Sequence, residues 1–444
     1  MWVVLLILLA FCGGYLFRTA TPMSDWLRRS LGTVVRWVSG DSDDAPPGRW
    51  RAFRPAAGAT QQQLIKDLQS LGYVGGVNPA PAKQGVTIHD KSQAHPGWNL
   101  YSSGHAAEAF LMDMDGKVAH RWQYPLQRLW PDYKRTREVW PESMNYWRRV
   151  HLLESGDLIA IYEGIGIVKV DKASNLIWSN QCRAHHDLFV HADGTVWVLT
   201  REAHVVPRIH MKKPILEDFI TVLDGSDGHV LRRTSVLECF ENSSYAPMLD
   251  KRKRWGDLFH TNTLEWLDGS HAHRSAIFKV GNILICVREL DIVAIVDPAA
   301  GAVVWALTGK WLRQHDPTLV NGGQILLFDN QGHAGRSKVI EFDPFTQQVG
   351  WWYGTAAGQE LFSYTCGTAQ RLPNGNTLIT ESDNGRAIEV AADGQIAWEY
   401  VNPNRTGPNK ELIATLTEVL RLPLTFPVEW LKRDAVPDPA SASP

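Results

Sequence analysis

Residues 309–323 read Gly-Lys-Trp-Leu-Arg-Gln-His-Asp-Pro-Thr-Leu-Val-Asn-Gly-Gly, and after Gln324 comes the apolar segment Ile325-Leu326-Leu327-Phe328. The stretch combines a polar entrance that contains His315, an Asn-Gly turn and a short apolar strand. Asn-Gly between apolar runs is a strong short-range signal for a β-hairpin. Because the same combination recurs along the chain, this stretch predicts a repeated β unit.

The repeat consists of a turn, an apolar strand, two further strands and usually a tryptophan. The other turns are Ser155-Gly156, Asp193-Gly194, Asp268-Gly269 and Asn374-Gly375, and the closing tryptophans are Trp122, Trp178, Trp305, Trp351 and Trp398. The last three tryptophans are 46 and 47 residues apart, the length of one four-stranded blade. With a first unit at 98–125 there are six units. We therefore predict an all-β, six-bladed β-propeller over residues 98–404, with a sandwich or a two-domain β protein as the alternative.

Two of the six units depart from the pattern. The third closes on Val230-Leu231 instead of a tryptophan, and it carries an insertion at 201–217. The fourth carries an insertion at 270–279. We expect both insertions to form loops on the propeller.

The composition is that of an ordinary globular protein. Of 444 residues, 44% are hydrophobic and 21% are charged, and the formal net charge is −2. A charge this close to zero gives no global field that would attract nucleic acid, so no nucleic-acid partner is expected. The five cysteines, Cys12, Cys182, Cys239, Cys286 and Cys366, are isolated and form no CxxC pair, which predicts neither a zinc motif nor a disulfide framework.

The N-terminus differs from the rest of the chain. Trp2 to Phe17 contains no charged residue, and Arg18 follows directly. The stretch lacks the basic start and the clear cleavage site of a signal peptide. We therefore predict that residues 1–22 form a single-pass membrane anchor or an uncleaved signal. The arginines that follow would by themselves favour a cytoplasmic main domain.

The remaining segments are short. For residues 23–97 the sequence predicts a juxtamembrane helix (25–38), then a linker and a short helix over 61–71. Thr60 is the expected N-cap of the short helix, and Gly72 is its expected stop. Residues 405–444 predict a C-terminal helix and a disordered tail.

Polar residues recur at matched distances before the turn glycines. His185 and His260 stand nine residues before Gly194 and Gly269, and Asn262 and His315 stand seven residues before Gly269 and Gly322. Because the first strand of each propeller blade lines the central channel, these side chains are expected to converge there. Each one alone also fits a blade-connecting loop or a hydrogen-bonded turn, and Arg288 alone fits a surface arginine at a strand end.

The residue types favour an anionic ligand over a metal. Three histidines suit a metal ion, but arginine cannot ligate a cation and its fixed charge repels one. Histidines beside Arg288 suit a group with several anionic oxygens, and an imidazole can also act as a nucleophile. We expect neither a metal nor a cofactor.

The motifs around these residues resemble those of the bacterial arylsulfotransferases. They are Cys-Arg-Ala-His185-His186-Asp-Leu, Phe-His260-Thr-Asn262, Val-Arg288-Glu and Gln-His315-Asp, and the resemblance covers about residues 98–404. It implies a six-bladed propeller that moves a sulfuryl group from a phenolic sulfate ester to an acceptor phenol, independent of nucleotide sulfate donors. It also implies ping-pong turnover through a sulfohistidine.

Carried over residue by residue, the resemblance implies that His315 is the nucleophile. It implies that His260, Asn262 and Arg288 hold the sulfuryl oxygens, and that the pair His185-His186 supplies the remaining active-site histidine. Family members can have a disulfide shortly before the nucleophile, whereas 287–315 contains no cysteine.

Location and rival functions complete the expectations. Since the family is generally exported, the resemblance implies a membrane-anchored protein whose catalytic domain is periplasmic. Two other functions remain open: a propeller enzyme with a histidine-ligated metal, and a non-catalytic, membrane-tethered propeller that binds an envelope partner.

Overall fold

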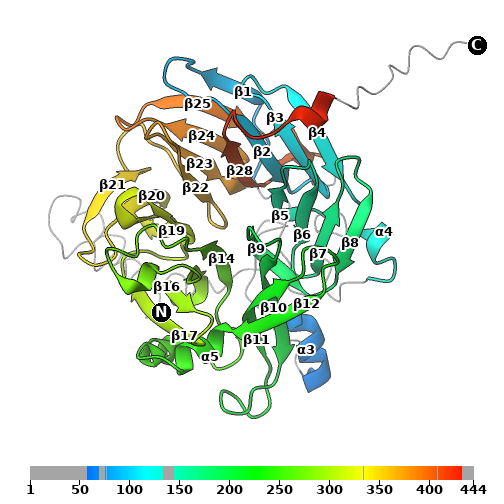
Figure 1. Ribbon diagram of the computed structural model, residues 1–444, viewed down its shortest axis with the longest axis vertical. Helices are drawn as coiled ribbons and strands as arrows, with labels where there is room; N and C mark the ends of the chain where they lie inside the picture. The colour runs from blue at the N-terminus through cyan, green and yellow to red at the C-terminus, as the bar shows by residue number, and fades with distance from the viewer. Residues whose placement is uncertain are drawn as a thin grey trace, which may run out of the picture. The chain divides into compact units, whose positions relative to one another are not determined.

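The computed structural model describes residues 58–69, 76, 78–133, 145–333, 335–407 and 409–432. Within these residues, six mainly antiparallel sheets stand around a common axis as the blades of a propeller (Figure 1). The prediction of an all-β, six-bladed propeller is confirmed.

The first three blades are as follows. Blade 1 contains β28 (Leu416–Leu422), β2 (Trp98–Ser103), β3 (Glu108–Met112) and β4 (Val118–Gln123). Blade 2 contains β5 (Trp147–Leu152), β6 (Leu158–Tyr162), β7 (Gly166–Val170) and β8 (Leu176–Asn180). Blade 3 contains β9 (Ala184–Val190), β10 (Val196–His204), β11 (Ile215–Leu223) and β12 (Val230–Ser235), and β13 (Gly256–Asp257) pairs with β11 in parallel.

The last three blades follow the same order. Blade 4 contains β14 (Thr261–Trp266), β15 (Ile283–Val287), β16 (Ile292–Asp297) and β17 (Ala302–Thr308). Blade 5 contains β18 (His315–Val320), β19 (Gln324–His333), β20 (Arg336–Phe342) and β21 (Val349–Tyr353). Blade 6 contains β22 (Thr368–Arg371), β23 (Thr377–Glu381), β24 (Arg386–Val390) and β25 (Ile396–Val401), with β1 (Gly85–His89) on its outer edge. The first strand named for each blade is the inner one, which contacts the inner strands of both neighbours.

The five predicted turns connect the inner strand of blades 2 to 6 with the second strand. Gly194 and Gly375 have φ angles of 89° and 90°, a backbone region that favours glycine because it has no Cβ. The predicted apolar strands after these turns are β6, β10, β15, β19 and β23. The repeat read from the sequence is therefore the repeat of the blades.

Three of the recurring tryptophans, Trp122, Trp178 and Trp398, join their blade to the next through an indole hydrogen bond. Trp122 of β4 donates its indole N–H to the Gly156 carbonyl in blade 2, at 2.9 Å. Trp398 of β25 donates in the same way to the Met114 carbonyl in blade 1, at 2.9 Å. Both rings are fully buried. A buried indole stabilises through its large apolar area when its N–H has a partner, so these residues hold successive blades together.

Residues 405–432 differ from the helix that the sequence predicts. They form β26 (Arg405–Thr406), β27 (Leu412–Ile413), β28 and a short 3-10 helix (Glu429–Lys432). β28 pairs with β2, and Leu420 lies opposite Leu100 across more than 300 residues of chain. Leu416 and Val419 pack into the core between blades 6 and 1. The strand is therefore stabilised by a distant partner that the local sequence pattern does not reveal.

The segment before the propeller contains a helix, α3 (Gln61–Gln69). The predicted N-cap is confirmed, since the Gln63 N–H donates to Thr60 Oγ1 at 3.2 Å. Leu68 of α3 packs against Ala203 and Leu216 of blade 3. The predicted anchor (1–22), juxtamembrane helix and Gly72 stop lie outside the described residues and stay predictions. No helix in the described part of the chain is both long and apolar enough to cross a membrane.

Short helices connect some of the strands, and the predicted insertions are only partly loops. The connecting elements are α4 (Leu126–Leu129), α5 (Val236–Glu241), and the 3-10 helices Ala246–Lys251, Ala276–Phe278, Arg288–Leu290, Asn321–Gly323 and Ser382–Asn384. Residues 201–204 and 215–217 of the first insertion extend β10 and β11, which pair as far as His204 opposite Ile215. The 270–279 insertion is a loop with one 3-10 turn.

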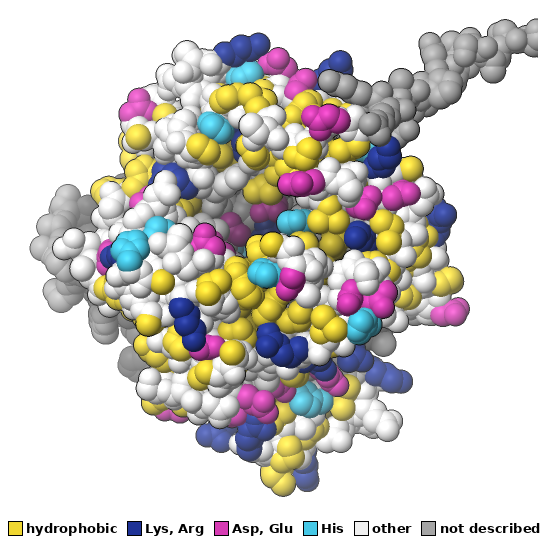
Figure 2. Space-filling view, viewed as in Figure 1, with side chains coloured by type: hydrophobic (Ala, Val, Ile, Leu, Met, Phe, Trp, Pro, Cys, Tyr) yellow, Lys and Arg dark blue, Asp and Glu magenta, His cyan; other side chains and the backbone are white. Residues whose placement is uncertain are grey.

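Arg149 of β5 ties the inner strands of four blades together. Its Nε lies 2.9 Å from Asp187 Oδ1 in blade 3, its Nη2 lies 3.2 Å from Asp316 Oδ1 in blade 5, and its Nη1 pairs with Glu418 in blade 1. Figure 2 shows one face of the propeller hollowed at its centre, with acidic side chains inside the hollow. Arg149 itself is only 7% exposed.

Two of these carboxylates also hold the next inner strand. Asp187 Oδ2 accepts from the Leu264 N–H at 2.8 Å, and Asp316 Oδ2 accepts from the Ala369 N–H at 3.0 Å. Burial raises the pKa of Asp187 to about 6, and the charge of Arg149 opposes that rise. Removal of the guanidinium would therefore leave several buried carboxylates without their main counter-charge.

We predict that Arg149→Met lowers the free energy of unfolding by roughly 3–5 kcal/mol, because breaking a buried ion pair leaves uncompensated charge. The difference in free energy of unfolding between the wild type and Arg149→Met should grow from pH 5.5 to pH 8. Without Arg149 the pKa values of Asp187 and Asp316 rise further, so the folded state binds more protons than the unfolded state and loses stability as pH rises. Urea unfolding followed by tryptophan fluorescence measures both effects.

Arg149→Lys is the control, because it keeps the positive charge and should recover part of the stability. A deficit of about 1 kcal/mol or less, typical of an exposed ion pair, and unchanged with pH would contradict a central role for Arg149.

Candidate active site

The predicted residues converge where the inner strands begin. His186, His260, Asp316 and Cys366 all have positive φ angles, between 53° and 56°. A left-handed backbone costs a non-glycine residue on the order of 1–2 kcal/mol, and such strain often occurs at functional sites. β-Bulges follow in the inner strands β9, β14 and β18. In β14, Asn262 and Thr263 together oppose a single residue of β15. The convergence therefore results from strained turns and bulges, and not from the simple strand alternation that the spacing suggested.

His315, the first residue of β18, has its tautomer fixed by its surroundings. Its Nδ1 lies 2.7 Å from Asn330 Oδ1 and 2.9 Å from the Arg313 carbonyl oxygen. Both partners are acceptors, so Nδ1 carries the proton and Nε2 carries the lone pair. Burial, and then the nearby charge of Arg288, hold the pKa of His315 well below its usual value. At neutral pH the ring is therefore neutral, with a nucleophilic Nε2.

The orientation of Asn330 is itself determined by hydrogen bonds. Its Nδ2 donates to the carbonyl oxygens of Ser363 and Cys366, at 2.9 and 2.6 Å. Since both N–H groups point toward blade 6, Oδ1 must face His315. Asn330 is completely buried, so no water competes for these bonds.

His260 has a carboxylate partner in the preceding segment. Its Nδ1 lies 2.7 Å from Asp257 Oδ2, and both side chains are buried. Burial lowers the pKa of His260, and Asp257 partly offsets that effect. Because Nδ1–H donates to the carboxylate, Nε2 carries the lone pair in the neutral ring. The pair therefore resembles the histidine and carboxylate of a general base.

His186 is the member of the histidine pair that contacts His260, with ring centroids 5.0 Å apart. His185 lies behind it: its Nδ1 is 2.9 Å from His186 Nδ1, and its Nε2 is 3.6 Å from Asp218 Oδ1. Burial holds the pKa of both rings well below the usual value, reinforced by Arg201 beside His185 and by Arg148 beside His186. Both rings are neutral at neutral pH.

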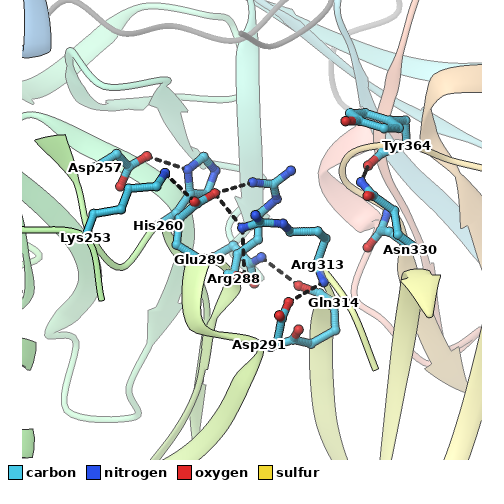
Figure 3. Close-up of polar contacts among 12 residues, drawn as sticks. Lys253, Asp257, His260, Arg288, Glu289, Asp291, Arg313, Gln314, Asn330 and Tyr364 are labelled. Atoms are coloured by element: carbon cyan, nitrogen blue, oxygen red, sulfur yellow. Dashed lines mark hydrogen bonds and ion pairs between the residues drawn. The ribbon is translucent and has the colours of Figure 1, made fainter. Parts of the chain in front are cut away.

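Arg288 is positioned by Glu289, the centre of a charge network (Figure 3). Glu289 Oε1 lies 2.7 Å from Arg288 Nη1 and 2.8 Å from Arg313 Nη1, and Oε2 lies 2.7 Å from Lys253 Nζ. Arg288 and Glu289 are buried, while Lys253 and Arg313 are partly exposed. One carboxylate thus pairs with three cations and fixes the guanidinium of Arg288, a group whose planar fork suits an anionic ligand.

Asn262 links the site to the inner strand of blade 5. Its Nδ2 donates to the Gln314 carbonyl at 3.0 Å, directly before His315, and its Oδ1 accepts from Thr263 Oγ1 at 3.1 Å. One of the two amide N–H groups is thereby used, and the second is the group that can donate to a ligand.

One group of side chains in the described residues lies close enough to share a cation: Glu163, His185 and His186, with ligand atoms within 4.8 Å of one another. Its surroundings argue against a metal. The two histidines use Nδ1 on each other, and Arg148 Nε lies 4.0 Å from Glu163 Oε2. Arg201 adds a second guanidinium charge beside His185. Two fixed positive charges disfavour a bound cation here.

Four further residues complete the site, and sequence reasoning did not single them out: Asn330, Asp257, Glu289 and Arg148. Glu289 is adjacent to Arg288, and Asp257 stands three residues before His260, so proximity in sequence was an available signal for both. Asn330 lies fifteen residues after His315 on the neighbouring strand, and its role depends on the pairing of β18 with β19.

Comparisons with known proteins identify a family. A family model described as Arylsulfotransferase (ASST) matches residues 149–403, more than half of the chain. No protein with a curated description matches the sequence.

Solved structures resemble the chain at low identity. A protein of unknown function from Bacteroides caccae is 12% identical, with 72% of this chain and 98% of that chain covered and a TM-score of 0.45. The propeller domain of Cps50 (Swd1) from Myceliophteria thermophila is 10% identical, with coverage of 76% and 100% and a TM-score of 0.42. A catalytically inactive virginiamycin B lyase from Staphylococcus aureus with quinupristin is 9% identical, with coverage of 76% and 99% and a TM-score of 0.39. These likenesses concern the fold alone.

The family match covers the residues that build the site except Arg148, which directly precedes the matched range, and it extends to the end of blade 6. The chain belongs to the arylsulfotransferase (ASST) family, and this membership implies arylsulfotransferase-like activity.

Proposed function

We propose that this protein transfers a sulfuryl group from a phenolic sulfate ester to an acceptor phenol, with His315 as the covalent carrier. The observation that supports this most directly is the state of His315: a buried, neutral imidazole whose Nδ1–H is held by Asn330 and the Arg313 carbonyl. That arrangement leaves the Nε2 lone pair as the nucleophile.

In the first half of the reaction, His315 Nε2 forms a bond to sulfur as the bond from sulfur to the phenolic oxygen breaks. The electron pair of that bond leaves on the phenolate. The transferred group carries charge on its equatorial oxygens, much as a phosphoryl group does. Arg288 and the second N–H of Asn262 are the donors to those oxygens. Preorganised donors of this kind usually provide the largest catalytic contribution.

The adduct places positive charge on the His315 ring, and Nδ1–H remains bonded to Asn330 Oδ1 and the Arg313 carbonyl oxygen. A protonated ring is a good leaving group. In the second half, the oxygen of the acceptor phenol attacks sulfur, the bond from nitrogen to sulfur breaks, and its electron pair returns to Nε2.

The Asp257–His260 pair suits the proton transfers. In its neutral state His260 has a lone pair at Nε2, so it can take the proton of the acceptor phenol, and Asp257 stabilises the imidazolium that forms. The departing phenolate of the next donor then takes that proton back. His186 is less suited, because the charge of Arg148 disfavours its protonation.

We predict that His315→Ala abolishes transfer between a chromogenic aryl sulfate and a phenol, because no other group supplies the nucleophile. Mass spectrometry of wild-type protein quenched at alkaline pH should find a sulfuryl group on His315, and the variant should show none. Arg288→Ala should retain residual activity, with a loss of roughly 3 kcal/mol in transition-state stabilisation. Full activity in His315→Ala would refute the nucleophile assignment.

Asn330 provides a test of the tautomer. We predict that Asn330→Ala lowers kcat by roughly 100-fold or more, as loss of a tautomer-fixing partner does in other histidine-dependent sites. Asn330→Asp should instead move the acid limb of the pH profile of kcat/KM to higher pH. A carboxylate beside Nδ1–H favours the imidazolium, so the neutral nucleophile is lost at a higher pH than in the wild type.

The matched control is Asn282→Ala, a buried asparagine outside the site that donates to the Ile277 carbonyl. It should leave the pH profile unchanged. If Asn282→Ala and Asn330→Asp shifted the profile equally, the effect would be structural, and the proposed role of Asn330 would fail.

The metal-dependent alternative is addressed by chelation. Since Arg148 and Arg201 disfavour a cation at Glu163, His185 and His186, treatment with a chelator should leave turnover unchanged. Loss of all activity on chelation, restored by a divalent cation and without any adduct on His315, would favour the metal enzyme instead.

A further inference from the structure

Arg148 is a buried arginine at the site whose guanidinium is incompletely paired. It follows Trp147 in β5, and its side chain is 5% exposed. Neither its Nε nor its Nη1 makes a hydrogen bond to any group in the described part of the chain. The nearest carboxylate oxygen, Glu163 Oε2, is 4.0 Å from Nε and accepts a hydrogen bond from the His186 N–H at 3.0 Å. A buried donor without a partner is costly, so it requires an explanation.

The neighbouring arginine, Arg149, differs from Arg148 in how its guanidinium is paired. Arg148 and Arg149 lie together in the bulge of β5, where they oppose a single residue of β6. Arg149 is bound by three carboxylates, from Asp187, Asp316 and Glu418. Arg148 has none at that distance. The same strand therefore directs one arginine to the structural centre and leaves the donors of the other available.

The surroundings of Arg148 place it at the reacting centre. Its charge lowers the pKa of His186 more than any other influence except burial, and it also lowers the pKa of His315 and of the Cys366 thiol. These residues belong to the starts of the inner strands of blades 3, 5 and 6. The geometry agrees: the Glu163 carboxylate beside Arg148 accepts from the backbone N–H of His186, whose ring is 5.0 Å from that of His260.

We propose that Arg148 is a second guanidinium that binds the oxygens of the transferred sulfuryl group, in addition to Arg288. This rests on the proposed function. Arg288 comes from the end of β15 in blade 4 and Arg148 from blade 2, so the two approach the anion from different sides. The fixed planar fork of arginine suits an oxyanion. The ligand would satisfy the donors that the protein leaves unpaired.

Glu163 has a supporting part in this arrangement. Its Oε2 is held by the His186 N–H, so it cannot move to Arg148 without breaking that bond. It moderates the charge of Arg148 in the empty site but leaves the guanidinium able to bind an anion.

The test compares Arg148→Met, which removes the charge at similar length, with Arg148→Lys, which keeps the charge but loses the fork. With a chromogenic aryl sulfate, Arg148→Met should lower kcat/KM by about 100-fold or more, and Arg148→Lys by less. The acid limb of the pH profile should move to higher pH in Arg148→Met, because removal of the positive charge raises the pKa of His315.

A second measurement does not need turnover. Calorimetric titration with inorganic sulfate should show binding to the wild type and much weaker binding to Arg148→Met. The matched control is Arg386→Met, which removes an arginine paired with Glu381 and Glu399 outside the channel. It can lower the melting temperature but should leave sulfate binding and the pH profile unchanged.

The outcomes separate the two proposals. A wild-type protein that binds sulfate through Arg148 but transfers no sulfuryl group would refute the proposed function and retain the anion site. Arg148→Met with kcat/KM and sulfate binding close to wild type would overturn the role of Arg148. If Arg386→Met lowered kcat/KM and sulfate binding as much as Arg148→Met does, lower stability would be the cause. That outcome would also overturn the role of Arg148. A wild-type protein that neither binds sulfate nor turns over would refute both.

Discussion

The ion pairs of Arg149 are the constraint on which the propeller centre depends. A single guanidinium from blade 2 meets carboxylates from blades 1, 3 and 5. Two of those carboxylates bind backbone N–H groups of the next inner strands as well. Because buried charges must be paired to be tolerated, the inner strands cannot shift independently of one another. The bulged starts of those strands, where the reactive side chains lie, are therefore held in fixed relative positions.

Each reactive group beside this centre is oriented by a partner side chain. Asn330 fixes the tautomer of His315, Asp257 holds His260, and Glu289 holds Arg288. Burial alone would make all these groups neutral or costly, and the partners decide where protons and charges lie. The chemistry of the site thus depends on pairs, and substitution of either member of a pair changes the state of the other.

Most of the fold could be predicted from the sequence. Asn-Gly and Asp-Gly turns and spaced tryptophans report local structure, and each blade repeats them, so six blades could be predicted. His185, His260 and His315 were found because they occupy matched positions in that repeat, whereas the role of Arg288 was predicted from the resemblance to the arylsulfotransferases. β28 was missed because its partner β2 is over 300 residues away. Asn330 was missed because its role depends on the pairing of β18 with β19. Arg148 was missed because it stands eight residues before Gly156, at neither of the two matched distances, and only a bulge places it beside the site.

The origin of β28 has a consequence for synthesis in the cell. A ribosome delivers the blades in order, and β2, β3 and β4 emerge before their inner strand β28, which lies more than 300 residues later in the chain. Until then the exposed edge of β2 has no partner, and an unpaired strand edge promotes aggregation. Glu418 arrives with that strand. The nascent chain therefore has neither a closed ring nor a complete centre until β28 has been synthesised and has paired with β2.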